Sequence, residues 1–303
     1  MEDIYLSIDI GGTAVKYATI DRAGNIIQAD KCVTPTDLET MYEKISSIVD
    51  AIPNHLKGIG ICSPGRVDVQ TGTIYNGGAL PFLHEVSFKT FIEEKYHVPC
   101  AVSNDGKAAA LSEVWLGNLK GIDNGAAIVL GTGVGGGIIV NGELIQGSHF
   151  QAGELSFLLR SPGKIELSNV IGFSASAVYF IKRAAALLQL EDENDGLAVF
   201  EAINAGENEA LQKLFADYCK EIAFVMLNLQ ATLDISKVVI GGGVSAQPIL
   251  IEEIKRQYAE IRGGSKAFCA VFDAVEIDAC KFRNNTNLLG AIYQLFLQMD
   301  SAD

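Results

Sequence analysis

The chain has 303 residues, of which 49% are hydrophobic, and its formal net charge is −14. This length favours about two domains with sizeable cores, and an acidic chain without a basic face argues against nucleic acid and anionic membranes as partners. The six cysteines contain no C-x-x-C pair, which argues against a zinc ribbon and against a disulfide framework.

The chain also lacks the usual signals for membranes and export. No apolar run approaches the roughly 18 residues that span a bilayer. The start, MEDIYLSIDIGG, has no basic region followed by an apolar region, so it does not resemble a signal peptide. We expect a cytoplasmic protein with no membrane partner.

Two segments of the chain share the same order of parts. Residues 5–21, YLSIDIGGTAVKYATID, and residues 125–142, GAAIVLGTGVGGGIIVNG, both read as strand, glycine turn and strand. In each case a polar turn and an aliphatic pair follow. We interpret this repetition as an internal duplication, in which two domains each begin with a β-hairpin around a glycine loop.

Further elements are expected in chain order. Helical spacing and capping residues predict helices, and β-branched runs predict strands. The expected helices cover residues 38–52, 106–117, 174–190, 207–234 and 285–299, and the expected strands lie within 56–65, 98–105 and 236–245. Strands that alternate with helices indicate an α/β fold with a largely mixed sheet.

The glycine loops are candidate phosphate sites, because backbone amides without a neighbouring Cβ can approach an anion closely. DIGGTAVK adds Asp9, Thr13 and Lys16, and an aspartate there is well placed to act on Mg²⁺, directly or through water. LGTGVGGG adds Thr132, but the strand that follows it argues against a dinucleotide fold. A single loop of this kind is as readily explained as a tight hairpin. The segment SKVVIGGGVS adds a third glycine loop, and three such loops in one chain favour a phosphate clamp.

The segment VSNDGKAAALSE places Asn104 and Asp105 where a strand passes into a helix. One interpretation makes Asp105 the N-cap of that helix. The other makes Asp105 a general base, because ligands of α/β sheets collect at the carboxyl ends of strands. A single residue can fill both roles.

Taken in order, DIGGTAVK, GIGICSPGRVD, SNDGKAAALSE, LGTGVGGGIIVNGELIQGSHFQAGELSF and VVIGGGVS resemble the successive motifs of the ROK family. That family comprises sugar kinases and sugar-responsive repressors. The resemblance runs over residues 4–295. It implies a two-domain actin/hexokinase-like (ribonuclease H-like) ATPase fold with a cleft between domains. Residues 1–117, with a helix at about 284–303 packing back on them, would form one domain, and residues 118–283 the other.

The resemblance implies a role for each matching position. On the nucleotide side, Asp9, Gly11, Gly12, Thr13 and Lys16 would form the first phosphate loop, with Asp9 near Mg²⁺, Thr132 and Gly133 the second, and Gly241, Gly242 and Gly243 would flank the adenosine. On the sugar side, Asp105 would be the catalytic base, Asn104 would hold a sugar hydroxyl, Gly65 and Arg66 would form a sugar loop, and Glu154 would grip sugar hydroxyls. The cofactors implied are ATP and Mg²⁺, and the implied assembly is a homodimer.

The sequence departs from the family pattern after Glu154. ROK kinases typically continue as GEIGH and then C-x-C-G-x-x-G-C-x-E, whose histidine and cysteines bind zinc. Here the chain reads GELSF, so Phe157 replaces the histidine, and residues 153–180 contain no cysteine. His149 alone does not make a site that needs about four ligands, and we predict no zinc site. The chain also lacks the glutamate that ends this family motif, and whether Glu166 replaces it stays open.

This loss motivates a hypothesis about the acceptor. Without the histidine, and with Phe157 in its place, the C1 side of the sugar would be apolar and open. We expect phosphorylation of the 6-hydroxyl of a β-glucoside or disaccharide, with a hexose, glucose or N-acetylmannosamine kinase as the alternative. A non-catalytic sugar-sensing regulator is the rival of another class. Asp9 and Asp105 favour the enzyme, as does a first glycine loop that begins at residue 9, without a preceding repressor-type DNA-binding segment.

Overall fold

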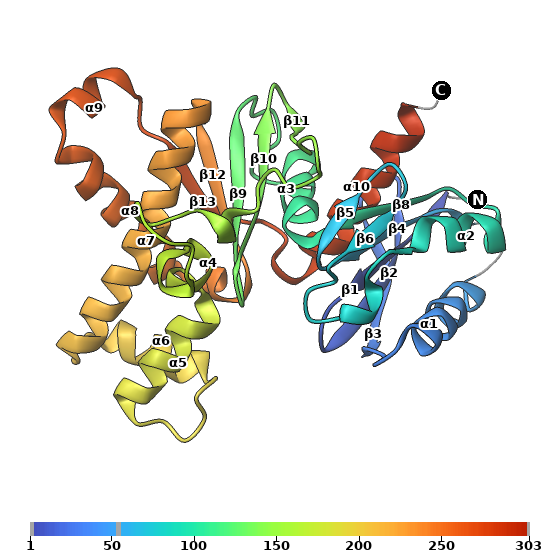
Figure 1. The fold of residues 1–303 in the computed structure, drawn as a ribbon, viewed down its shortest axis with the longest axis horizontal. Helices are drawn as coiled ribbons and strands as arrows, with labels where there is room; N and C mark the ends of the chain where they lie inside the picture. The colour runs from blue at the N-terminus through green and yellow to red at the C-terminus, as the bar shows by residue number, and fades with distance from the viewer. Residues whose placement is uncertain (1–2, 53–55, 302–303) are drawn as a thin grey trace. The chain divides into compact units, whose positions relative to one another are not determined.

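The computed structural model describes residues 3–52 and 56–301. The chain divides into two compact units (Figure 1), and each is described by itself. The first comprises Met1–Gly117, Gln146–Ala152 and Asn285–Asp303, and the second comprises Asn118–Ile145 and Gly153–Asn284. The short segment Gln146–Ala152 therefore belongs to the first unit although both of its neighbours in the chain belong to the second.

The first unit is built on a five-stranded sheet. Its strands lie in the order β3 (Ile26–Val33), β2 (Ala14–Asp21), β1 (Ile4–Ile10), β4 (Leu56–Ser63) and β8 (Cys100–Asn104). Strands β1 to β3 are antiparallel, whereas β4 and β8 run parallel to β1. A small sheet of β5 (Arg66–Asp68), β6 (Thr73–Tyr75) and β7 (Val86–Ser87) adds to it, with helices α1 (Leu38–Asp50), α2 (Phe88–Tyr96), α3 (Asp105–Trp115) and α10 (Thr286–Asp300).

The second unit repeats this topology. Its sheet has the order β11 (Glu143–Leu144), β10 (Val134–Val140), β9 (Gly125–Leu130), β12 (Lys237–Gly241) and β13 (Glu276–Ala279). Again a hairpin, β9–β10, is followed by two strands parallel to its first strand. The predicted repeat of a β-hairpin around a glycine loop and the predicted α/β class are confirmed. The helices are α4 (Ile171–Ser174), α5 (Ala177–Leu188), α6 (Gly196–Ala205), α7 (Glu209–Leu233), α8 (Pro248–Gly263) and α9 (Lys266–Val271).

Short 3-10 helices complete the description. They are η1 (Pro81–Leu83), η2 (Leu155–Phe157), η3 (Leu167–Asn169), η4 (Gly243–Ala246) and η5 (Arg283–Asn285). The helix predicted over 174–190 is confirmed as α5 but is shorter than predicted, because α4 ends at Ser174 and α5 begins at Ala177 with Ser176 as its N-cap. The Ser176 hydroxyl accepts a hydrogen bond from the backbone N–H of Tyr179, which is the capping role that serine fills well.

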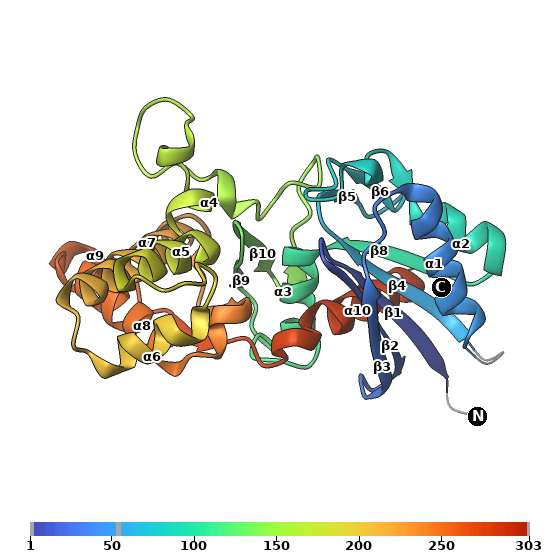
Figure 2. The ribbon, with the colours of Figure 1, turned by 90° about the horizontal axis from the view of Figure 1, so that it is seen from below.

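Helix α10 closes the core of the first unit from the far end of the chain. It packs on α3 and on strands β1, β4 and β8, beside which it runs in Figures 1 and 2. Two glycines allow this approach: a Cβ on Gly290 would lie 1.8 Å from the carbonyl oxygen of Ala108, and one on Gly60 would lie 2.4 Å from that of Ala291. The buried hydroxyl of Ser7 donates to the carbonyl of Leu288 at 2.7 Å. The sheet and this helix therefore form one packed body.

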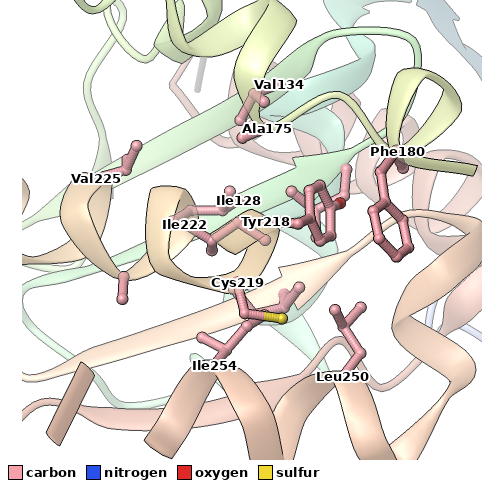
Figure 3. Packing of buried hydrophobic residues seen from close by; sticks show 14 of the residues in the cluster. Ile128, Val134, Ala175, Phe180, Tyr218, Cys219, Ile222, Val225, Leu250 and Ile254 are labelled. Atoms are coloured by element: carbon pink, nitrogen blue, oxygen red, sulfur yellow. The ribbon is translucent and has the colours of Figure 1, made fainter. Parts of the chain in front are cut away.

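The core of the second unit lies between its sheet and its helices (Figure 3). Ile128 of β9 and Val134 of β10 meet Ile222 of α7 there. The rings of Phe180 and Tyr218 stack with centroids 4.4 Å apart, which adds aromatic packing to the aliphatic contacts. This core fixes the ends of β9 and β12, from which two glycine loops emerge.

Within residues 3–52 and 56–301, no helix has both the length and the apolar character needed to cross a bilayer. All six cysteines are free, and four of them, Cys62, Cys100, Cys219 and Cys280, are buried.

Candidate functional site

Polar side chains gather at the carboxyl ends of the parallel strands of the first unit. Asp9 on β1 is paired in register with Cys62 on β4, and Cys62 is paired with Ser103 on β8. Asp105 follows directly after β8, as the first residue of α3. The topology therefore brings together Asp9 and Asp105, which are 96 residues apart in the chain. This edge is where open α/β sheets bind ligands.

Asp9 is a carboxylate with little access to water. Its residue is 8% exposed, Asn287 of α10 donates to its Oδ1 at 3.2 Å, and the Lys16 ammonium lies 3.9 Å from its Oδ2. Burial raises the pKa of Asp9 above its ordinary value, while Asn287, Lys16 and the Cys62 thiol each lower it by a smaller amount. A cation beside this carboxylate would stabilise its charged form and so offset the cost of desolvation.

Asn104, and not Asp105, caps helix α3. The backbone of Asn104 is extended, and its side-chain Oδ1 accepts from the N–H groups of Gly106 and Lys107 at 2.9 and 3.3 Å. The interpretation of Asp105 as the N-cap is therefore wrong, because its backbone is already helical. The Asn104 amide donates to the carbonyl of Gly65 at 2.8 Å, which ties the predicted sugar loop to the start of the helix.

The carboxylate of Asp105 is oriented while part of its surface stays exposed. Its Oδ1 accepts from the N–H of Gly106 at 2.8 Å, and the residue is exposed. Desolvation by the surrounding protein nevertheless raises the pKa of Asp105. The hydrogen bond from Gly106 lowers this pKa, and the negative charge of Asp9 raises it further. An oriented, accessible carboxylate with a raised pKa has the properties of a general base.

Two cationic side chains hold the segment Gln146–Ala152 on the first unit. The buried Lys107 ammonium donates to Gln146 Oε1 at 2.9 Å and to the carbonyl of Phe150 at 2.8 Å. Arg66 donates to the carbonyl of His149 at 3.3 Å, and its guanidinium lies 4.1 Å from the ring centre of Tyr75. Arg66 is thus already engaged by protein groups, and it joins the sugar loop to this segment.

The first glycine loop, Gly11–Thr13, is a tight turn between β1 and β2. The N–H of Gly11 donates to the carbonyl of Ala14 at 3.0 Å, and the Thr34 hydroxyl donates to the carbonyl of Gly11 at 2.6 Å. A Cβ on Gly11 would lie only 2.9 Å from the Ala14 oxygen. Gly12 and Thr13 are exposed, so the turn presents its backbone to solvent.

Two glycine loops of the second unit lie side by side at the ends of neighbouring strands. Thr132 and Gly133 follow β9, and Gly241 ends β12, which is parallel to β9. Gly242 has φ +94°, and a Cβ there would lie 2.0 Å from the carbonyl oxygen of Leu130, the last residue of β9. The third loop can therefore approach the second only because it is glycine.

The glycine run after the second loop has a different role from the one that its sequence suggests. Gly135–Gly137 are not part of a phosphate loop, since all three lie within strand β10. The turn that carries Glu154 packs against this strand, and a Cβ on Gly136 would lie 2.6 Å from Leu155 Cδ1. These glycines make room for the turn. The loop itself ends at Gly133.

Phe157 and the segment after it differ from their surroundings in exposure. The Phe157 side chain is 74% exposed, and Ile165 and Leu167 are exposed to a similar extent. Figure 2 shows the segment before α4 as a projecting loop. Arg160 anchors its base through two hydrogen bonds to the carboxylate of Glu221. Glu166, considered as a substitute for the lost glutamate, lies exposed on this loop.

No group of three or more His, Cys, Asp or Glu side chains forms a metal site among the residues described. The carboxylates of Asp9 and Asp105 are nevertheless suited to Mg²⁺, which prefers oxygen ligands and keeps several waters when one or two carboxylates hold it. The desolvation of Asp9, which raises its pKa, supports that fit, because a cation would stabilise the charged carboxylate.

Four residues of these sites were not identified from the sequence. Cys62 and Asn287 contact Asp9, Lys107 holds the Gln146–Ala152 segment, and Ser156 bonds to the strand after the second loop. Only Cys62 carried a usable signal, because it ends a strand predicted beside that of Asp9.

Comparison with known proteins agrees with these features. The model of the ROK family matches residues 5–164 and 175–298. The β-glucoside kinase of Listeria monocytogenes is 29% identical, over 97% of this chain and 98% of that protein. The glucokinase of Halalkalibacterium halodurans is 30% identical, over 99% and 97%. A ROK family protein from Streptococcus pneumoniae, solved in complex with sucrose, is 26% identical with a TM-score of 0.87, over 98% and 99%.

These similarities extend over nearly the full length of this chain and of each protein compared with it, so they do not depend on a single motif. The solved ROK structures confirm the fold class predicted from the sequence. Together with the family match over most of the chain, they show that this protein belongs to the ROK family.

Proposed function

We propose that this chain is an ATP-dependent sugar kinase, which transfers the γ-phosphoryl group of ATP to a sugar hydroxyl. The observation that carries the proposal is Asp105, an oriented carboxylate with a raised pKa at the carboxyl end of β8, next to the buried Asp9. The relatives named as β-glucoside kinase and glucokinase support the reaction class, because each is matched over nearly its whole length.

The nucleotide-side residues follow from the glycine loops. In the first unit, the amides of Gly12 and Thr13 would bind phosphate oxygens, with Gly11 forming the turn and Lys16 adding a positive charge. In the second unit, Thr132 and Gly133 would do the same, and Gly241–Gly243 would flank the adenosine. Each of these loops contains a glycine at which a Cβ would lie closer than 3.0 Å to another protein atom, namely Gly11, Gly133 and Gly242.

Asp9 would hold Mg²⁺, directly or through water, and the ion would supply neutralisation of the charge that develops on the phosphates. Asn287 keeps the carboxylate of Asp9 in a fixed orientation for this task. Since the Cys62 thiol is also bonded to Asp9, the carboxylate is oriented from two sides.

Asp105 would accept the proton of the attacking sugar hydroxyl. A bond forms between that hydroxyl oxygen and the γ-phosphorus, the bond to the β–γ bridging oxygen breaks, and ADP leaves with the electron pair. The proton then passes from Asp105 to solvent. The transition state is loose, so orientation by the N–H of Gly106 contributes more than basicity.

We infer that the acceptor carries a substituent at C1, as in a β-glucoside or disaccharide. Glu154 would grip sugar hydroxyls, with Gly65, Arg66 and Asn104 as the other sugar-side groups. Phe157 follows Glu154 by three residues and is 74% exposed, so its ring is free to stack on a substituent. The relative named β-glucoside kinase favours this class, whereas the glucokinase favours free glucose.

A coupled assay of ADP release across a sugar panel tests both the kinase reaction and the proposed class of acceptor sugar. Cellobiose and methyl β-glucoside should give the highest kcat/KM, above glucose and N-acetylmannosamine. Glucose or N-acetylmannosamine far ahead of the glucosides would refute the acceptor class. No sugar-dependent ADP from any member would refute the kinase and favour a non-catalytic sugar-sensing regulator.

A matched pair of variants addresses Phe157. Phe157→Ala should raise KM for the glucosides about fivefold to tenfold and leave KM for glucose nearly unchanged, because a stacked ring contributes on the order of 1 kcal/mol. Leu167→Ala, in the same exposed segment, is the control and should change neither value.

We further propose that the two compact units are the two domains of the kinase and that the enzyme is a cytoplasmic homodimer. Light scattering after size-exclusion chromatography would test the assembly, and a mass of one chain would contradict it.

A further inference from the structure

The turn that carries Glu154 is fitted to strand β10 along its length. Gly153 has φ +85°, and a Cβ on it would lie 3.0 Å from the carbonyl oxygen of Gly136. Leu155 is buried over Gly136, as described above. The turn and the strand therefore form one surface within the second unit.

Ser156 extends this fit to the residue after the second phosphate loop. Its hydroxyl oxygen accepts from the N–H of Val134 at 2.8 Å and donates to the carbonyl of Val134 at 3.1 Å. One side chain thus satisfies both backbone groups of the first residue of β10. Val134 directly follows Gly133, so the hydroxyl holds the backbone at the point where the loop ends.

The space around Ser156 is closed on two further sides. A Cβ on Gly133 would lie 2.7 Å from Ser156 Oγ, and a Cβ on Gly172 of α4 would lie 2.7 Å from both Cβ and Oγ of Ser156. The hydroxyl therefore has little freedom to turn away from Val134. In the family pattern GEIGH a glycine stands at this position, and a glycine has no hydroxyl to make these contacts.

We propose that Ser156 is a positioning residue that couples the sugar-gripping turn at Glu154 to the phosphate loop at Thr132 and Gly133. The proposal rests on the proposed function, because it assigns ligands to both segments. A ligand that orders either segment would order the other through Val134, so acceptor and nucleotide would raise each other's affinity. Such coupling is reciprocal by thermodynamic necessity.

Hydrogen exchange with the non-hydrolysable analogue AMPPNP as probe tests this link. In the wild-type protein, AMPPNP should protect the amides of residues 153–157 as well as those of 131–134. In Ser156→Ala the protection of 153–157 should fall about fivefold to thirtyfold, because one or two hydrogen bonds of about 1 kcal/mol each are lost. Ser236→Ala is the control, since that hydroxyl also bonds a backbone carbonyl of this unit, that of Asn124 at 3.1 Å.

A second variant perturbs the contact between Ser156 and Val134 by a change at Gly172, which lies outside residues 131–134 and 153–157. Gly172→Ala places a methyl group against Ser156 and should reduce the AMPPNP-dependent protection of 153–157 as Ser156→Ala does. Adding Ser156→Gly removes the crowding, so the double variant should regain thermal stability but not the protection. This separation distinguishes positioning from general damage to the fold.

The outcomes are distinct. Equal AMPPNP-dependent protection of 153–157 in wild type and Ser156→Ala overturns the coupling while leaving the kinase intact. Absence of protection at 153–157 in the wild type overturns it as well. A protein that does not bind AMPPNP at all contradicts the proposed function, and the coupling falls with it.

Discussion

The two units have sheets of the same strand order but place different chemistry at the carboxyl edges of those sheets. In the first, β1 and β8 lead to Asp9 and Asp105, which are acidic groups with raised pKa values. In the second, β9 and β12 lead to Thr132, Gly133 and the glycines at 241–243, which are neutral.

The difference teaches that the repeated topology determines where ligands bind, and that the residues at the end of each strand determine the chemistry there. The acidic edge can accept a proton and hold a cation. The neutral edge can offer backbone N–H groups to an anion without adding negative charge. Three substitutions can break or sharpen this contrast.

The largest effect should come from Asp105→Asn. Loss of a general base lowers kcat by about 10²- to 10⁴-fold, whereas the dissociation constant of the sugar should change by no more than about threefold, since the amide keeps its oxygen for the N–H of Gly106. Coupled ADP release and calorimetric sugar binding measure the two quantities. Asp123→Asn, an exposed carboxylate of the second unit, is the control. Near-normal turnover of Asp105→Asn would show that Asp105 is not the general base, and the proposed chemical difference between the acidic and neutral edges would then be wrong.

A smaller effect is expected from Lys107→Met. The change leaves Gln146 Oε1 and the carbonyl of Phe150 without their charged donor, which should lower the free energy of unfolding by about 2–3 kcal/mol. Urea unfolding measures the stability, and hydrogen exchange should rise first in residues 146–152. Lys89→Met, which removes one exposed bond to the carbonyl of Gln70, should cost less than about 0.5 kcal/mol. Equal effects of the two variants would show that the buried lysine does not hold this segment.

The smallest effect concerns the stability of the acidic edge. Burial raises the pKa of Asp9, so the folded state binds more protons than the unfolded state at pH values between the ordinary and the raised pKa. Stability is therefore lost as the pH rises through that interval. Asp9→Asn should gain about 0.5–2 kcal/mol at pH 7, the usual range for a stabilising change at a functional site.

Thermal unfolding at several pH values tests this sign. The advantage of Asp9→Asn should shrink as the pH falls toward 3.8, the ordinary pKa of the group. The charged and polar neighbours Lys16, Asn287, Cys62 and Asp105 are unchanged in this variant. A loss of stability at pH 7 would show that the ion pair with Lys16 outweighs the desolvation of Asp9.

Local patterns were sufficient to predict the repeated hairpins and the major helices. A strand, a glycine turn and a second strand are adjacent in the sequence, so the order of parts was readable at both 5–21 and 125–142. The pairing of β1 with β4 and of β9 with β12 follows from the α/β alternation. The position of Asp105 at a strand end was predictable for the same reason.

Other features depended on contacts that no local pattern records. Asn104 and Asp105 are both good capping residues, and only the extended backbone of Asn104 decides between them. Gly135–Gly137 have the composition of a loop, and the turn that needs their space lies about twenty residues later. Lys107 stands in an alanine-rich helix, where a lysine ordinarily faces solvent.

The return of helix α10 to the first unit bears on how the protein is made. Residues 1–117 leave the ribosome about 170 residues before Asn285–Asp303, a delay on the order of ten seconds at typical rates of synthesis. Until then the surfaces of Gly60 and Ala108 that receive α10 have no cover. The second unit is complete by residue 284, so the half that is synthesised first is the half that finishes folding last.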